Sequence, residues 1–291
     1  MRSDIEQAIL LLKRGDAGAM EKAVALLQRS VFAFSMRVCG QRQDAEDTMQ
    51  EVLVKSLPHL AKFDSSRALT VWLYKVAKNR CLMSRRKSKF APKMELSLEE
   101  LMPDRDDFER LDGRISVSPE GAAIRGEQGR RLREAIRGLP PHYRIVLVLR
   151  DMEGLTDEEV AEITGLLPGT IRVRLHRARL FVRRELAKLN EGTKNNVVLR
   201  DVKGAARTRR CKKMFAELSD YLDGQLDDFS CEEIEAHLDG CQPCKKFLRS
   251  LETAIKRCQR SPTERPDPSQ AAALRKQLLA TYSRALANAG N

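Results

Sequence analysis

Residues 139–179, LPPHYRIVLVLRDMEGLTDEEVAEITGLLPGTIRVRLHRAR, decide the expected fold. Thr156 and Glu159 have the spacing of a capping box, which predicts that a helix begins there. Gly165 is the residue type that most readily takes the left-handed conformation at a helix end. After a short turn, a second helix is expected from about Thr170. Two helices joined in this way form a helix-turn-helix, which can insert its second helix into the major groove.

The second helix has one apolar face and one basic face. At about 100° per residue, four apolar side chains share one side and are expected to be buried. They are Ile171, Leu175, Ala178 and Val182. The opposite side is basic, and arginine there can bind guanine or phosphate oxygens. The predicted DNA-binding residues are Thr170, Arg172, Val173, Arg174, His176, Arg177 and Arg179. An ordinary amphipathic helix with a solvated basic face is the alternative that the pattern leaves open.

The same stretch resembles region four of extracytoplasmic-function sigma factors. The resemblance rests on the initial LP, the hydrophobic helix after it, EGLTDEEVAEITG at 153–165 and GTIRVRLHRAR at 169–179. In that family this domain binds the minus-thirty-five promoter element, so the resemblance implies the same role here. Val173 departs from the family, in which a small polar residue is common at this position.

A second resemblance covers residues 43–89, QDAEDTMQEVLVKSLPHLAKFDSSRALTVWLYKVAKNRCLMSRRKSK, which are similar to region two of the same family. It implies that a polar helix face contacts core RNA polymerase through Asp44, Asp47, Gln50 and Glu51. It also implies contact with the minus-ten element through Asn79, Arg80, Arg85, Arg86 and Lys87. The loop 64–68 would hold an unstacked base, and basic and aromatic side chains are suited to holding single strands. Taken alone, the acidic face also fits a merely solvated surface.

A histidine and two cysteines near the C-terminus have the spacing of metal ligands. His237 and Cys241 are four residues apart and therefore share a helix face, and Cys244 follows after a Gln-Pro turn. Cys211 is the preferred fourth ligand, with Cys231 as the alternative. Three thiolates and one imidazole would form a closed tetrahedral site for structural Zn²⁺.

The segment around these ligands resembles zinc-binding anti-sigma domains, through CKKMFAELSDYLDGQL at 211–226 and EIEAHLDGCQPC at 233–244. In that family the helices bind a sigma factor and hide its polymerase-binding surface. Residues 211–241 contain two basic and nine acidic residues, for a net charge of −7, whereas the whole chain carries +12. We therefore expect an acidic module that inhibits the basic domains, senses a signal or docks a partner.

Composition and the absence of certain motifs further restrict the class of protein. No apolar segment approaches the ~20 residues that span a bilayer, and the N-terminus lacks a signal-peptide core, so a cytoplasmic location is expected. Thiols stay reduced there, and the seven cysteines are therefore expected to be free thiols or metal ligands. Cys39, Cys81 and Cys258 are predicted to be incidental or buried thiols. The chain lacks a phosphate-binding glycine loop and a nucleophile elbow, which argues against an enzyme.

The predicted fold class is all-α, with two helical sigma domains and a small helical zinc-binding domain. The expected parts are region two at 1–90, an acidic flexible linker at 91–120, region four at 121–189, a linker at 190–210, the zinc-binding domain at 211–260, and a proline-rich linker with a last helix at 261–291. The expected function is promoter recognition and transcription initiation, regulated by the zinc-binding domain. The expected partners are core RNA polymerase, promoter DNA and a signalling protein that acts on the zinc module. The alternative is a helix-turn-helix regulator with a zinc sensor that acts without sigma activity.

Overall fold

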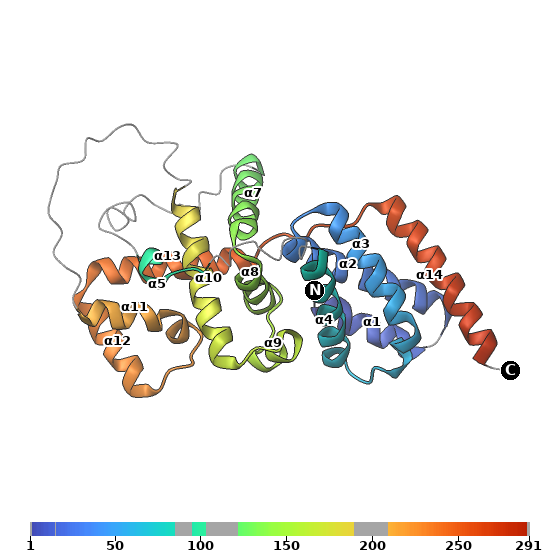
Figure 1. Cartoon of the computed structure of the whole chain (residues 1–291), viewed down its shortest axis with the longest axis horizontal. Coiled ribbons are helices and arrows are strands. Elements are labelled where there is room, and N and C mark those ends of the chain that lie inside the picture. The colour runs from blue at the N-terminus through green and yellow to red at the C-terminus, as the bar shows by residue number, and fades with distance from the viewer. Residues whose placement is uncertain (1, 15, 85–94, 103–121, 189–208, 290–291) are drawn as a thin grey trace. The chain divides into compact units, whose positions relative to one another are not determined.

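The computed structural model describes residues 2–14, 16–84, 95–102, 122–188 and 209–289, and every regular element within them is helical. The all-α prediction is confirmed for these residues. The chain divides into two compact units. Figure 1 shows the whole chain, coloured by residue number. Unit 1 contains Met1–Pro92, Leu155–Leu166 and Pro262–Asn291, and unit 2 contains Lys93–Gly154 and Leu167–Ser261. None of the described helices is long and apolar enough to cross a membrane.

Unit 1 is built around α2, against which α1, α3, α4 and α14 pack. Its helices are α1 (Arg2–Arg14), α2 (Ala17–Cys39), α3 (Arg42–Ser56), the 3-10 helix η1 (Leu57–Lys62), α4 (Ser66–Ser84), α9 (Asp157–Thr164) and α14 (Pro268–Ala289). Val24, Leu27 and Val31, which recur at helical spacing along α2, are buried. Phe34 stacks on Tyr74 of α4 with ring centroids 4.2 Å apart, so aromatic packing joins α2 to α4.

Both ends of α2 are fixed by local hydrogen bonds. Asp16 accepts a hydrogen bond from the Ala19 amide at 2.7 Å, which satisfies one of the unpaired donors at the helix start. Gly40 takes a φ of 77° and donates its amide to the Met36 carbonyl at 3.1 Å. Glycine takes this left-handed conformation without steric cost, so α2 ends at Cys39.

The last helix, α14, lies within the predicted range 261–291 and packs on α2, α3 and η1 of unit 1. Leu274 and Leu278 are buried. Gln28 of α2 donates to the Ala271 carbonyl at 2.9 Å. Arg275 lies 3.4 Å from the Glu21 carboxylate. The C-terminal helix is therefore part of the same unit as α2 and α3.

Unit 2 is built around α10, which contacts α5, α7, α8, α11 and α13. Its helices are α5 (Leu98–Leu101), α7 (Ala122–Gly138), α8 (Pro141–Leu147), the π-helix η2 (Val148–Met152), α10 (Pro168–Lys188), α11 (Arg209–Leu222), α12 (Asp228–Gly240) and α13 (Gln242–Gln259). Figure 1 shows α11, α12 and α13 grouped beside α10. The Cys/His segment and the long basic helix therefore form one packed unit.

The segment 95–102 differs from the flexible linker expected there. Leu96 and Leu101 are buried, and the Leu96 amide donates to the Tyr143 hydroxyl at 3.2 Å. That hydroxyl in turn donates to Glu95 at 2.9 Å, a hydrogen bond that lowers the pKa of the carboxyl group. Apolar residues within an acidic sequence thus attach this segment to α8. The predicted linker residues 91–94, 103–120 and 190–208 lie outside the described residues. The last two residues of the second predicted linker, 209 and 210, instead begin α11.

Local sequence signals correctly located the helix ends around residue 160. Thr156 and Glu159 form the predicted capping box, and Gly165 ends α9 with a φ of 74°. The helix α10 begins at Pro168, two residues before the predicted start. Its predicted apolar face is buried, with Ile171, Leu175, Ala178 and Val182 at most 2% exposed.

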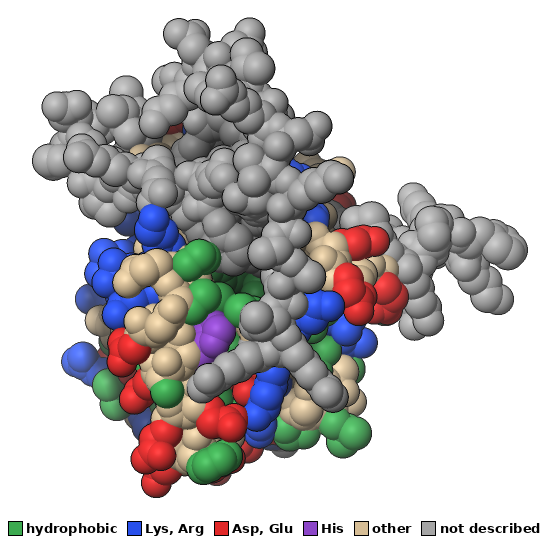
Figure 2. Space-filling model, turned by 90° about the vertical axis from the view of Figure 1, so that its left-hand side faces the viewer, with side chains coloured by type: hydrophobic (Ala, Val, Ile, Leu, Met, Phe, Trp, Pro, Cys, Tyr) green, Lys and Arg blue, Asp and Glu red, His purple; other side chains and the backbone are tan. Residues whose placement is uncertain are grey.

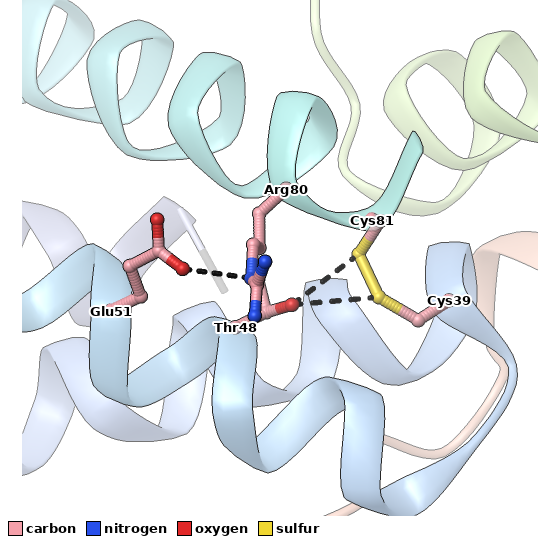
Figure 3. The surroundings of a disulfide bond; sticks show 5 residues. All are labelled: Cys39, Thr48, Glu51, Arg80 and Cys81. Carbon is pink, nitrogen blue, oxygen red and sulfur yellow. Dashed lines mark hydrogen bonds and ion pairs between the residues drawn. A yellow bond between two sulfur atoms is a disulfide. The ribbon is translucent and has the colours of Figure 1, made fainter. Parts of the chain in front are cut away.

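The prediction that Cys39 and Cys81 are free thiols is wrong. They form a disulfide between the last residue of α2 and the C-terminal part of α4, with Cα atoms 5.2 Å apart (Figure 3). This Cα separation is within the range that a disulfide requires. The two residues are 42 positions apart, so only the packing of α2 against α4 brings them together. Cys258 is a buried cysteine outside this disulfide, as predicted.

Candidate DNA-binding and metal sites

The first half of α10 keeps its predicted DNA-binding side chains accessible. Val173 is 51% exposed, and Thr170, Arg172 and Arg174 are half-buried. The buried residue between them, Ile171, anchors this turn to the core. Base-contacting residues of a helix-turn-helix lie at the start of its second helix, so this end of α10 has the form required for groove insertion.

The second half of α10 does not have the solvated basic face that its sequence predicts. His176, Arg179 and Arg183 are 7%, 3% and 3% exposed, and Leu180 is fully buried. The reason is that α11 and α13 pack against this part of α10. Arg177 remains half-buried and lies 3.4 Å from the Tyr143 hydroxyl. DNA contact by His176 and Arg179 stays a prediction, and it requires α11 to move away from them.

Arg179 joins α10 to two acidic residues. Its guanidinium donates to both carboxylate oxygens of Asp151 in η2, at 2.6 and 2.9 Å. It also donates to both oxygens of Asp223, which follows α11, at 2.9 Å each. Burial opposes the charge on Arg179, but the two carboxylates raise its pKa above the usual range. A buried arginine with two bidentate partners holds a fixed geometry.

His176 makes a second link between α10 and α11. Its Nδ1 atom lies 2.8 Å from the Ser219 hydroxyl oxygen, and its ring contacts Phe215 edge-on at 5.9 Å. Burial, with smaller contributions from the positive charges of Arg179 and Arg177, lowers the pKa of His176 to about 4. The imidazole is therefore neutral in this packed arrangement at neutral pH.

Arg183 links α10 to α13. Its guanidinium lies 4.2 Å from the ring centroid of Phe247 and donates to the Ser250 hydroxyl at 3.0 Å. Arg183, Ser219, Asp223 and Ser250 are not among the site residues predicted from the sequence. The single sequence signal for these contacts was the acidic charge of the C-terminal module.

The predicted polymerase-binding residues lie along α3. Asp47 and Gln50 are exposed, and Asp44 and Glu51 are half-buried. Asp47 accepts a hydrogen bond from Gln43 at 3.1 Å. The buried residues of the helix, among them Met49, face the core, so the four polar residues are presented outward.

The predicted minus-ten residues lie near the C-terminal end of α4, where the structure describes two of them. Asn79 is exposed. Arg80 is 41% exposed and lies 2.7 Å from Glu51, a pairing that contributes to lowering the pKa of that carboxyl group after the larger effect of Lys55. A polymerase-contact candidate and a promoter-contact candidate are thus neighbours. Arg85, Arg86 and Lys87 lie outside the described residues.

The four predicted metal ligands come together in unit 2. The ligand atoms of Cys211, His237, Cys241 and Cys244 all lie within 4.8 Å of one another. The Nε2 atom of His237 is 3.6 Å from the Cys211 sulfur and 3.4 Å from the Cys244 sulfur. Cys211 comes from α11, His237 from α12 and Cys244 from the first turn of α13, while Cys241 lies between α12 and α13. The group therefore connects three helices.

The alternative ligand, Cys231, is not a member of this four-residue group. Burial, followed by the nearby carboxylates Glu235, Asp228 and Asp227, raises the pKa of the Cys231 thiol. Burial and the adjacent cysteines 241 and 211 raise the pKa of Cys244. Three sulfurs and one imidazole suit a soft divalent cation, which supplies the positive charge that closely spaced thiolates need. The structure and the donor set indicate a metal site.

Figure 2 views the end of the molecule that lies on the left in Figure 1. Acidic side chains gather at the lower edge of this face, with basic side chains beside them. The coloured part of this face therefore carries both charge signs. Within the acidic segment 211–241, the carboxylate of Asp223 is directed at Arg179.

These features are those of an all-helical protein that has a basic helix suited to DNA and a four-residue group suited to a metal ion. Three family models match the chain, namely "Sigma-70 region 2" over residues 23–90, "Sigma-70, region 4" over 129–182 and "Putative zinc-finger" over 211–245. The chain belongs to the sigma-70 family of RNA polymerase sigma factors, in its extracytoplasmic-function (ECF) group.

Several named proteins match this chain over up to 65% of its length. It is 30% identical over 188 residues to the RNA polymerase sigma-H factor of Pseudomonas aeruginosa, covering 63% of this chain and 94% of that protein. It is 29% identical over 189 residues to the ECF RNA polymerase sigma factor SigW of Bacillus subtilis, covering 65% and 100%. A solved structure of the sigma factor RpoE in complex with the anti-sigma factor NepR from Bartonella quintana matches with a TM-score of 0.40 and 23% identity, covering 55% and 92%.

Proposed function

We propose that this ECF sigma factor binds core RNA polymerase and promoter DNA and carries its own inhibitory domain. Residues Asp44, Asp47, Gln50 and Glu51 are the proposed polymerase contacts, because α3 presents them outward. The proposed promoter contacts are the C-terminal part of α4 and the first half of α10. We propose the parts as region two at 1–90, region four at 121–189 and the metal-binding domain at 211–260.

The observation that carries the inhibitory role is the burial of α10 by α11 and α13. Promoter-contact candidates His176 and Arg179 are covered, and Asp223 takes the position on Arg179 that a DNA phosphate would otherwise occupy. The first turns of α10 remain accessible. The module therefore restrains region four by holding its second half, rather than by covering the whole recognition helix.

Zn²⁺ is the proposed ion of the Cys211, His237, Cys241 and Cys244 group. A closed set of three thiolates and one imidazole leaves no position for a catalytic water, so the metal would have a structural role. It would hold α11 to the start of α13, and these are the helices that pack on α10. A signal that removes the metal would therefore loosen the module from region four.

The docking of α14 adds a second proposed restraint, on region two. This helix contacts α2, α3 and η1, and α3 carries the proposed polymerase-binding residues. Buried Leu274 and Leu278 provide the apolar contact, and Gln28 and Arg275 supply polar ones. We expect α14 to compete with core polymerase for access to this side of region two.

In-vitro transcription tests the sigma function. Core polymerase alone should give no specific transcript, and addition of the protein should give transcripts that start at a defined site on a cognate promoter. Binding to duplex DNA without core, together with no initiation when core is present, would favour the helix-turn-helix regulator instead. An Asp47→Lys variant should lower core affinity, whereas Glu6→Lys on the exposed side of α1 serves as the charge-matched control.

A further inference from the structure

The disulfide in region two joins two elements that the proposed function uses. Cys39 is the last residue of α2, and Cys81 follows Arg80 in α4. We propose that Cys39 and Cys81 form a reversible redox cross-link that controls how α4 is presented to promoter DNA. The effect on transcription rests on the proposed sigma function, whereas the cross-link itself rests on the packing of α2, α3 and α4.

The packing around the two sulfurs favours this pairing. Cys39 is 0% exposed and Cys81 is 1% exposed, and their Cα atoms lie 5.2 Å apart. The Thr48 hydroxyl of α3 lies 3.8 Å from each sulfur (Figure 3). Gly40, with its positive φ, ends α2 directly after Cys39 and so fixes the position of that residue. The cross-link therefore holds the end of α2 and the end of α4 together beside α3.

The cross-link lies one residue from a promoter-contact candidate. Arg80 reaches Glu51 of α3 at 2.7 Å, next to the disulfide in Figure 3. Both side chains are more than one third exposed, so this ion pair is weak and cannot by itself fix the end of α4. The disulfide is a covalent restraint at the same place. Its reduction leaves the last turn of α4 held by non-covalent contacts alone.

The burial of both sulfur atoms determines how the disulfide can be formed and reduced. A sulfur that is at most 1% exposed is reached only after local opening, and helix ends open more easily than helix centres. Cys81 is three residues from the last residue of α4, Ser84. The end of α4 is therefore the segment that opens, and the cross-link changes slowly compared with an exposed disulfide.

The oxidant is a low-molecular-weight disulfide. One cysteine thiolate attacks a sulfur of this disulfide and releases one small thiolate, which leaves a mixed disulfide on the protein. The second cysteine thiolate then attacks the protein sulfur, forms the Cys39–Cys81 bond and releases the second small thiolate. The protein loses two electrons and two protons, and the small disulfide becomes two thiols. Two molecules of the small monothiol reverse both steps, first forming the mixed disulfide and then releasing the small disulfide, and leave both protein thiols reduced.

The cross-linked form is the more active one. Restraining the end of α4 in its bound position lowers the ordering cost of holding a promoter strand. Reduction should therefore lower promoter-dependent transcription by at least about threefold, because a pre-organised surface loses less freedom on binding. It should also lower the melting temperature of unit 1 by ~10 °C, as expected when a cross-link over a loop of this size is removed.

The experiment uses the full-length, zinc-saturated protein equilibrated with oxidised or reduced glutathione. Differential alkylation with mass spectrometry gives the state of Cys39 and Cys81, while melting and transcription with core polymerase give the consequences. The Cys39→Ala plus Cys81→Ala variant should match the reduced wild type in both buffers. Cys258→Ala, which removes another buried thiol, should respond like wild type.

Three results would overturn the proposal. They are free Cys39 and Cys81 thiols in oxidised buffer, equal transcription from both redox states, and a redox response that persists in the double variant and so comes from the metal-site cysteines. If no form initiates transcription, the proposed sigma function fails. Alkylation and melting then still test whether the cross-link forms. The cross-link is supported only if reduction lowers the melting temperature of the wild type and leaves that of the double variant unchanged.

Discussion

Asp223 binds the guanidinium of Arg179 through both of its carboxylate oxygens, each at 2.9 Å. Arg179 belongs to the helix that is proposed to read promoter DNA, and Asp223 belongs to the metal-binding module. The pair is part of a buried network with Asp151, in which all groups are hydrogen-bonded. Such networks fix one arrangement, and removal of a single partner is costly.

Asp223→Asn should loosen the module from α10. It removes one of two carboxylates from a buried arginine and should destabilise unit 2 by about 1–3 kcal/mol. Because Arg179 becomes available, promoter-dependent transcription should rise. Glu232→Gln removes the same charge from an exposed position of α12 and should have no effect. Equal transcription from the Asp223→Asn variant and wild type would show that this contact is not inhibitory.

Acidification should weaken the contact between α10 and α11 through His176. Its pKa of about 4 in the folded protein is below its ordinary value of about 6.5, so the unfolded chain takes up the proton first. The stability from neutral His176 is present above about pH 6.5 and is lost as pH falls toward 4. The groups around the ring are Arg177 and Arg179 of α10, and Ser219 and Phe215 of α11.

Between about pH 7 and pH 4.5, this one group should cost about 2 kcal/mol of stability. His176→Gln keeps a hydrogen-bonding side chain but does not titrate, so it should lose correspondingly less stability over this range. Denaturant unfolding at the two pH values measures the difference. An equal loss in wild type and variant would mean that other groups, such as the carboxylates around Arg179, account for the acid sensitivity.

Replacing two of the proposed metal ligands should loosen the metal-binding module from α10. Cys241→Ser plus Cys244→Ser should abolish stoichiometric Zn²⁺ binding in metal analysis, because two of four ligands are lost. Cys231→Ser is the matched control and should retain the metal, since Cys231 lies outside the four-residue group. Zinc retained by the double variant, or lost by the control, would show that the ligand set is different.

Undocking α14 should increase the affinity for core polymerase. Leu274→Asp plus Leu278→Asp places two charges at buried positions and should release the helix from α2 and α3. Ala272→Asp plus Ala273→Asp adds the same charges at exposed positions and serves as the control. Fluorescence titration of the labelled protein with core measures the change. Unchanged affinity in the Leu274 and Leu278 variant would remove α14 from the inhibitory account.

Local signals made part of the structure predictable. The capping box of Thr156 and Glu159, the left-handed Gly165 and the buried face of α10 depend on neighbours within a few residues, and all were predicted. The grouping of the four proposed metal ligands was predicted from spacing and resemblance, with Cys211 inside the group and Cys231 outside it.

Features that depend on packing between distant segments were not predictable. Helical periodicity placed Arg179 on an exposed face, whereas the residue is buried. Periodicity depends on the sequence of α10 alone and gives no information about the packing of α11 against it. The Cys39–Cys81 pairing arises from the packing of α2 against α4 across 42 positions. The docking of residues 95–102 on α8 depends on two leucines within an acidic stretch, whose composition favoured a linker.

Run-off transcription with core polymerase, comparing the full chain with residues 1–190, tests inhibition by the C-terminal part most directly. The truncated protein lacks α11 to α14, so both proposed restraints are removed. We predict more promoter-specific transcript from residues 1–190 than from the full chain at equal concentration. Transcription no higher than that of the full chain, from a truncated protein whose melting transition is intact, would contradict the account.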